Sequence, residues 1–320
     1  MAEKEAYSEL MKQIYAGQMV FTGEIEPLKT ANMEPYIKEG KKLKQAGCVA
    51  GNVTHNPKAD ATISSMAASY TIQKDSGLEC VYQLTCRDMN RMALVSDILG
   101  AAHLGLHNCL ALTGDHPSVG DTPESKPVFD LDGQQLAMLV REIVDQHTAF
   151  GKKLKEKLEM FPKMHVGCAA NPNGKDDGFW AEILKLKRKS GIAEFCQTQV
   201  VFDIDHTVEW CQEVKKFGIP VLIGIFPMKN YPTAKGFNDF VPGVKIPEAT
   251  LDEFKAVHKS DMSDEEKEAE YERKNVEFWV PFVKELFDKQ LVAGAHVMAV
   301  QYASCVKAIT AELGVTPTEE

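Results

Sequence analysis

Short, almost continuously apolar runs recur along the whole chain, separated by longer stretches in which apolar and charged residues are mixed. The runs cover residues 20–25, 47–54, 78–85, 108–114, 164–170, 193–203, 220–226 and 294–300. Most of them begin roughly thirty residues apart, which is the length of one strand–helix–strand unit. A run that is apolar on both faces is typical of a strand in a parallel sheet covered on both sides. The pattern therefore predicts eight parallel strands.

The stretches between the runs have the periodicity of amphipathic helices. Helices are expected at residues 34–46, 88–105, 177–190 and 205–217, and several end at a glycine before the next apolar run. Eight strands that alternate with helices predict a (β/α)8 TIM barrel, forming a single domain over residues 1–320. A doubly wound sheet is the alternative, but no G-x-G-x-x-G motif follows the first run.

Two of the spacings are too long for a simple repeat unit. Both contain Pro- and Gly-rich segments, so long loops are expected at about residues 115–135 and 227–260. The charged run at 263–290 that follows the second segment is typical of a helix with a solvated face.

Composition excludes several classes of protein. With 44% hydrophobic and 26% charged residues, the 320-residue chain can fill a large core, and its net charge of −10 disfavours nucleic-acid binding. No apolar run is long enough to span a membrane, and the N-terminus lacks the apolar centre of a secretion signal. The eight cysteines contain no C-x-x-C pair, which indicates buried, reduced thiols in a cytoplasmic protein and no metal site.

Polar residues follow the predicted strands at their carboxyl ends, where barrel enzymes hold their catalytic groups. Glu24 ends the first run and Asp115 follows the fourth. We expect both carboxylates to face one cavity, where one could donate a proton and the other could stabilise a developing cation. A single carboxylate at a strand end is more often a helix cap or an ion-pair partner, so the functional interpretation depends on the two occurring together.

Motifs at these strand ends, taken in order, resemble the catalytic barrel of the methylenetetrahydrofolate reductase family over about residues 19–314. E-I-E-P-L-K-T (24–30) is similar to the family's E-F-F-P-P-R-T, and L-A-L-T-G-D (110–115) to A-L-R-G-D. Q-T-Q-V-V-F-D (197–203) resembles I-T-Q-F-F-F-D, and G-I-F-P-M-K-N-Y (224–231) resembles G-I-L-P-V-S-N-F. The family's L-K-R-K stands unchanged at 186–189.

The resemblance implies roles for particular residues. Glu24 matches the family's general acid, and Asp115 the carboxylate that favours a cationic intermediate. The implied substrate-binding residues are Gln199 and Tyr231; Gln301, a polar residue after the eighth run, is expected to bind substrate with them. The implied cofactor-binding residues are Thr54, Gln83, Thr113, Gly114, Asn171, Arg188 and Lys189.

The same resemblance implies reduction of 5,10-methylenetetrahydrofolate to 5-methyltetrahydrofolate, with hydride from the N5 atom of a reduced flavin, FAD in preference to FMN. The electron donor would be NAD(P)H or a partner iron–sulfur protein, and the enzyme would be a homo- or hetero-oligomer. Thr113, Gln83 and Asn171 replace the family's Arg, His and Tyr in the flavin pocket. Two alternatives stay open: a flavin-free, pterin-binding barrel of a folate-linked methyltransferase system, and a non-catalytic subunit that docks a partner enzyme.

A few other residues carry weaker expectations. Glu26 is either a second acid near the pterin or a loop ion-pair partner of Lys29. His55 and His116 are expected to make capping or loop hydrogen bonds. His296 is expected to pack at the bottom of the barrel. The three tryptophans are expected to pack helices on the barrel or to form subunit contacts: Trp180, Trp210 and Trp279.

Overall fold

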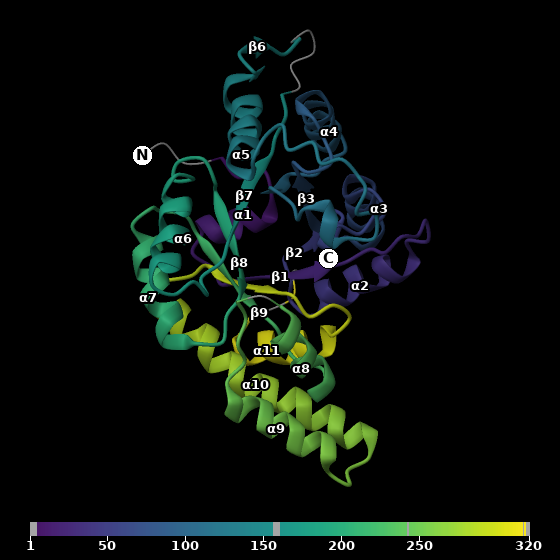
Figure 1. The fold of residues 1–320 in the computed structure, drawn as a ribbon, viewed down its shortest axis with the longest axis vertical. Helices are drawn as coiled ribbons and strands as arrows, with labels where there is room; N and C mark the ends of the chain where they lie inside the picture. Colours follow the sequence, from purple (N-terminus) through teal and green to yellow (C-terminus); the bar gives the residue numbers. More distant parts are fainter. Residues whose placement is uncertain (1–4, 156–160, 242, 316, 318–320) are drawn as a thin grey trace.

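The computed structural model describes residues 5–155, 161–241, 243–315 and 317. A closed barrel of parallel strands lies at its centre, with helices around it (Figure 1). Around the barrel the strands run β1 (Val20–Ile25), β2 (Ala50–Val53), β3 (Glu79–Thr85), β4 (Asn108–Leu112), β7 (His165–Ala170), β8 (Phe195–Val200), β9 (Val221–Ile225) and β10 (Gly294–Val297). Each strand lies within one of the eight apolar runs, which confirms the (β/α)8 TIM barrel and excludes a doubly wound sheet.

Eleven α-helices are present in the described part of the chain. They are α1 (Glu9–Tyr15), α2 (Glu34–Gln45), α3 (Ser65–Ser76), α4 (Arg91–His103), α5 (Gly133–Arg141), α6 (Asp177–Lys187), α7 (Ile204–Lys215), α8 (Tyr231–Phe240), α9 (Glu248–Lys259), α10 (Asp264–Asp288) and α11 (Ala303–Glu312). Shorter elements are the helical turns η1 (Pro57–Ala59), η2 (Pro117–Val119) and η3 (Glu142–Gln146) and the hairpin of β5 (Thr148–Ala149) and β6 (Lys152–Lys153). None of the helices in the described ranges has the length and apolarity needed to cross a bilayer.

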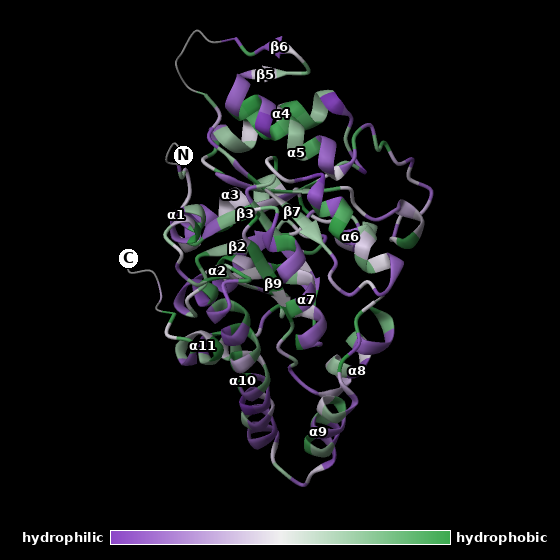
Figure 2. Cartoon of the chain, turned by 90° about the vertical axis from the view of Figure 1, so that its left-hand side faces the viewer, coloured by the Kyte–Doolittle hydropathy of each residue, from purple (hydrophilic) through white to green (hydrophobic). Residues whose placement is uncertain are grey.

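The region expected to be a long loop at 227–260 is mostly helical, and that prediction is wrong. α8 and α9 occupy most of it and extend, with α10, away from one side of the barrel (Figure 2). The prolines that suggested a loop begin the helices: Pro232 lies in the first turn of α8 and Pro247 immediately precedes α9. Proline is well tolerated there, because the first amides of a helix have no intrahelical acceptor.

The base of the barrel is filled by apolar side chains and closed by α1. The buried residues of α1 are Leu10, Met11 and Ile14. They pack on apolar residues of six strands, Val20, Ala50, Val81, Leu110, Phe195 and Leu222. The carboxylate of Glu79 holds α1 in place by accepting the backbone amides of Glu9 and Leu10 at 2.8 and 3.1 Å, where the helix end is electropositive.

A polar layer lies above this apolar base. The side-chain amides of Asn52 and Gln197 exchange two hydrogen bonds, at 2.5 and 3.0 Å, and Gln197 also donates to the Thr22 hydroxyl at 3.1 Å. The Thr22 hydroxyl lies 2.9 Å from Nδ1 of His296. The prediction that His296 packs at the barrel bottom is wrong, because its register partner is Thr22, in the middle of β1. Its second ring nitrogen therefore faces the mouth of the barrel.

Outside the strands, the packing agrees with the sequence in most respects. Trp210 and Trp279 are fully buried between helices and barrel, as expected, and all eight cysteines are buried and free. Trp180 does not pack on the barrel, since 54% of it is exposed on α6. The helical periodicity of 177–190 identified the helix, but it did not distinguish its inner face from its outer face.

Candidate active site

Two adjoining cavities open at the carboxyl ends of the barrel strands. The first mouth cavity, about 450 Å³, lies over β1 to β4, and its lining includes Glu24, Thr54, Gln83, Thr113, Gly114, Asp115 and Gln199. The second mouth cavity, about 360 Å³, lies over β7 and β8, and its lining includes Glu24, Gln83, Asn171, Glu182, Gln199 and His296. Glu24, Gln83 and Gln199 line both, so the cavities adjoin. Their volumes are in the range of small-molecule binding sites.

Glu24 occupies the centre of this arrangement. Its side chain projects into the barrel from β1 above Thr22, and 20% of it is exposed. Oε2 lies 3.7 Å from Nε2 of His296, whose other nitrogen contacts Thr22. The polar layer of the barrel interior thus holds His296, and His296 faces Glu24. A carboxyl group with one imidazole neighbour and access to two cavities is well placed to exchange a proton with a ligand.

Gln199 reaches the mouth because β8 is irregular at this point. Gln197 pairs with Leu222 but Val200 pairs with Gly224, so β8 contains one residue more than β9 between these pairs. A Cβ on Gly224 would lie 2.4 Å from the Thr198 carbonyl oxygen, so only glycine permits this bulge. Bulges of this kind commonly redirect side chains at active sites. The amide oxygen of Gln199 accepts the amide of Val200 at 2.9 Å, which leaves its NH2 group available to a ligand.

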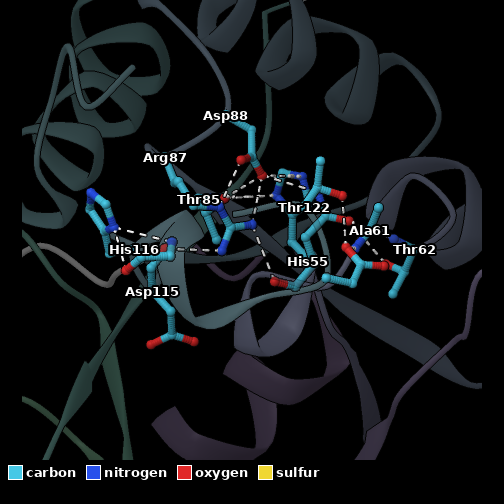
Figure 3. Close-up of polar contacts among 12 residues, drawn as sticks. His55, Ala61, Thr62, Thr85, Arg87, Asp88, Asp115, His116 and Thr122 are labelled. Carbon is cyan, nitrogen blue, oxygen red and sulfur yellow. Dashed lines mark hydrogen bonds and ion pairs between the residues drawn. The ribbon is translucent and has the colours of Figure 1, made fainter. Parts of the chain in front are cut away.

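A buried arginine organises the loops on the Asp115 side (Figure 3). Arg87, only 3% exposed, makes two hydrogen bonds of 2.7 Å to the carboxylate of Asp88. It also donates to the backbone carbonyls of Asp115 and Asn56, both at 3.2 Å. The carboxylate of Asp115 itself points away from this cluster. Arg87 therefore positions the backbone of Asp115 and leaves its carboxylate free to face the cavity.

Burial and hydrogen bonding set the charge states beside this arginine. Burial opposes ionisation of Asp88, but hydrogen bonds from Arg87 and Asn56 outweigh it and lower the pKa of this carboxyl. Burial lowers the pKa of His55 to about 4, so its imidazole is neutral at pH 7. Nδ1 of His55 accepts the backbone amide of Thr85 at 3.1 Å. His116 likewise accepts the amide of Ser118, so both histidines make the local hydrogen bonds expected of them.

Glu26 lies two residues beyond Glu24 on the same side of the chain. Lys29, its expected partner, is paired instead with Asp121, so the loop ion pair between Glu26 and Lys29 does not form. Burial raises the pKa of Glu26, the charge of Glu24 raises it further, and Lys58 opposes the shift. Glu26 is thus a half-buried acid near Glu24 that holds its proton more readily than an exposed glutamate.

The Glu26→Gln variant should be more stable than the wild type at neutral pH. Because the pKa of Glu26 is higher in the folded state, the unfolded chain releases this proton at a lower pH. The free energy of unfolding therefore falls as pH rises, and the full cost of the buried charge is present above the folded-state pKa. Glutamine removes the cost, and the difference should vanish below about pH 3, where both states are protonated. Urea unfolding at the two pH values measures it, with Glu124→Gln, an exposed glutamate, as control. A stability difference between variant and wild type that is the same at both pH values contradicts the burial argument.

The residues expected to bind a cofactor divide into two groups. The first group lines the mouth cavities: Thr54, Gln83, Thr113, Gly114 and Asn171. Arg188 and Lys189 lie outside the linings described for these cavities. The ammonium group of Lys189 donates to the Ala169 carbonyl at 3.0 Å, and Arg188 is exposed beside Gln134 of α5. The described residues also contain no cluster of three or more His, Cys, Asp or Glu side chains suited to a metal ion.

Two of the expected substrate-binding residues lie away from the mouth cavities. Tyr231 begins α8, and its ring centroid is 5.8 Å from that of His258 on α9. Gln301 lines a separate cavity beside α11. The structure thus brings Glu24, Asp115 and Gln199 together and places Tyr231 and Gln301 further out on the same rim.

Sequence reasoning missed three residues of the site. His296 was assigned to the barrel bottom, and Glu182, which lines the second mouth cavity from α6, was overlooked within a helical stretch. Arg87 was not singled out, although an Arg–Asp pair just after a buried strand is a signal for a charged cluster at the rim. The signal for His296 was its position in a buried run, where a histidine needs a polar partner.

Comparisons with known proteins agree with this geometry. A family model described as methylenetetrahydrofolate reductase matches residues 9–314. Methylenetetrahydrofolate reductase 2 of Saccharomyces cerevisiae is 32% identical over 167 residues, covering 50% of this chain and 25% of that protein. The probable methylenetetrahydrofolate reductase (NADPH) of Caenorhabditis elegans is 21% identical over 313 residues, covering 94% of this chain and 43% of that protein. The chain spans less than half the length of these curated relatives.

Among solved structures, an uncharacterized protein from Clostridium thermocellum superposes with a TM-score of 0.64, covering 96% of this chain and 99% of that one. That protein is described as binding two copies of 5-methyl-5,6,7,8-tetrahydrofolic acid. At 13% sequence identity, the likeness shows that the two proteins share a fold.

Proposed function

Because the chain belongs to the methylenetetrahydrofolate reductase family, we propose that it reduces 5,10-methylenetetrahydrofolate to 5-methyltetrahydrofolate. The observation that carries the proposal is that Glu24 of β1, Asp115 from the loop after β4 and Gln199 of β8 line one cavity at the barrel mouth. The folate bound by the structural neighbour from Clostridium thermocellum supports a folate as the ligand.

The adjoining cavities suit a flavin ring beside a pterin. Both ring systems are flat and carry carbonyl and N–H groups at their edges, and the cavities offer uncharged partners from Gln83, Asn171 and Gln199. Thr54 and Thr113 add hydroxyl groups, and no charged side chain beyond Glu24 is shared by the two cavities. When bound, a reduced flavin supplies the hydride.

The chain's own residues supply position and protons. Glu24 would protonate N10 of the folate, which opens the five-membered ring and leaves a cationic iminium at N5. The Asp115 carboxylate, held in place through its backbone by Arg87, would favour that cation. The free NH2 group of Gln199 would orient the pterin. His296, fixed by Thr22, would hold the Glu24 carboxyl group at the cavity.

A flavin-free, folate-binding barrel is the second candidate. It is favoured by the positions of Arg188 and Lys189, the cations expected to bind the flavin phosphate, because both lie outside the linings of the mouth cavities. The two folates of the structural neighbour agree with this alternative, since the second would take the place of a flavin.

The visible spectrum of the purified protein separates the two candidates. A reductase should be yellow, be bleached by an anaerobic reductant and regain colour when 5,10-methylenetetrahydrofolate is added, with 5-methyltetrahydrofolate detected by mass spectrometry. NADH, NADPH and reduced ferredoxin, tried separately as reductants, identify the electron donor. A colourless protein that gains no flavin when incubated with FAD or FMN but binds 5-methyltetrahydrofolate establishes the second candidate and contradicts the first.

A further inference from the structure

A third cavity, about 750 Å³, lies on the same rim as the mouth cavities and is larger than either. The segments that follow β9 and β10 line it together with α2, α8, α9, α10 and α11. We call it the lysine cavity, because four lysines from four of these segments line it: Lys42, Lys229, Lys267 and Lys307.

None of the four lysines makes a close ion pair among the described residues, although Lys42 and Lys229 lie near enough to Glu39 to lower its pKa. Other lysines of the same helices are paired: Lys274 contacts Glu253 at 3.1 Å, and Lys284 contacts Asp288 at 2.9 Å. The acidic residues that share the lysine cavity are Glu39, Asp264 and Glu268. Burial raises the pKa of Glu39, so its carboxyl group holds a proton more readily than an exposed glutamate, although Lys42, the Gln301 amide and Lys229 oppose the shift. The cavity therefore has an excess of positive charge.

Two buried polar atoms in the lysine cavity are incompletely satisfied, with only the Gln301 amide beside Glu39 and the Cys305 thiol beside Tyr302 in the described part of the chain. Glu39 and Tyr302 are only 6% and 5% exposed, and neither Oε1 of Glu39 nor the Tyr302 hydroxyl makes a regular hydrogen bond within the described ranges. A buried polar group without a partner is costly, so such groups commonly mark the place of a ligand or an ordered water. The Tyr302 phenol can donate to an anion.

The first turn of α11 adds further donors. This ten-residue helix begins at Ala303, in the wall of the lysine cavity, and no side chain caps it at Tyr302. The free amides at such a helix end attract anions. Lysines, an uncapped helix end and the buried Tyr302 hydroxyl therefore converge on one cavity.

The lysine cavity lies beside the part of the mouth that holds Glu24. β9, β10 and β1 are neighbours in the barrel. Glu24 lies on β1 and faces His296 on β10, while Lys229 and Gln301 follow β9 and β10 directly. A folate whose pterin lies at Glu24 can therefore extend its acidic tail outward across this sector of the rim.

We propose that the lysine cavity is an anion subsite that binds the carboxylates of the substrate's glutamate tail. This inference rests on the proposed function, because it requires a folate at the barrel mouth. Phosphate groups of a nucleotide would satisfy the same donors, so the experiment must distinguish carboxylates from phosphates.

Calorimetric titration with 5-methyltetrahydrofolate carrying one or three γ-linked glutamates tests the subsite. The triglutamate should bind the wild type about tenfold more tightly, as expected for a few partly solvated ion pairs. The Lys42→Gln/Lys307→Gln double variant should lose most of this advantage. The Lys284→Gln/Lys289→Gln double variant removes the same charge from the far end of α10 and should retain the triglutamate's advantage in affinity.

The outcomes separate the subsite from the function. Equal affinity of the wild type for both folates would overturn the subsite and leave the reductase proposal intact. Binding of neither folate would overturn the proposed function and the subsite with it. Inorganic pyrophosphate that binds in a manner dependent on Lys42 and Lys307, without a triglutamate advantage, would assign the cavity to phosphate and overturn the carboxylate proposal. Circular dichroism of both double variants verifies folding.

Discussion

Replacing Glu24 by glutamine should lower the turnover of 5,10-methylenetetrahydrofolate by about 100- to 10,000-fold, the usual contribution of a general acid. Glutamine has nearly the same shape but cannot deliver a proton to the folate nitrogen. Reduction of bound flavin by the electron donor should change little, because that step does not need this proton. Stopped-flow measurement of the two half-reactions separates the effects.

Two variants act as controls for this result. Glu34→Gln changes an exposed carboxylate at the start of α2 and should leave both half-reactions as in the wild type. His296→Gln should weaken folate reduction less than the Glu24 change, since His296 contacts Glu24 and acts through it. Folate turnover that survives in Glu24→Gln would remove this residue from its role.

The Arg87→Met variant should lose about 3 kcal/mol of unfolding free energy, the lower end for breaking a buried ion pair. Methionine retains much of the side-chain volume but none of the five donors. The Asp88 carboxylate and the carbonyls of Asn56 and Asp115 would then lose the hydrogen bonds that Arg87 provides. Urea denaturation measures the loss.

Arg91→Met is the matched control for that variant. Arg91 also contacts an aspartate, Asp130, at 3.0 Å, but 53% of its side chain is exposed, and exposed ion pairs contribute little to stability. Equal destabilisation by the two substitutions would contradict the view that burial makes Arg87 important. In Arg87→Met protein that remains folded, activity should also fall, because Asp115 loses the contact that holds its backbone.

The barrel could be predicted from the sequence because parallel strands leave a strong local signal. Each strand is covered on both faces, so it appears as a short apolar run, and the eight runs identify all eight barrel strands. The mouth could be anticipated for the same reason: once a strand is located, its carboxyl end is known. Glu24 and Asp115 were accordingly predicted to share a cavity, and they do; Gln199, to which the family resemblance pointed, lines the same cavity.

Features that depend on register or on distant contacts could not be predicted in this way. Arg87 was visible only as a polar residue, because its partners Asn56 and Asp115 come from other loops. The loop wrongly predicted at 227–260 is a related case, because the prolines that indicated a loop lie at the starts of α8 and α9. It also explains the lysine cavity, whose lysines lie between residues 42 and 307 of the sequence.

The sequence by itself determined the strands, their parallel order and the acidic and amide groups at their ends, because burial on both faces constrains composition locally. The tertiary structure decided which side chains meet. Register placed His296 beneath Glu24, a single bulge directed Gln199 to the mouth, and the packing of α11 on α2 brought Lys42 and Lys307 to one cavity. These contacts join residues far apart in the chain, and their energies depend on a geometry that exists only after the barrel closes.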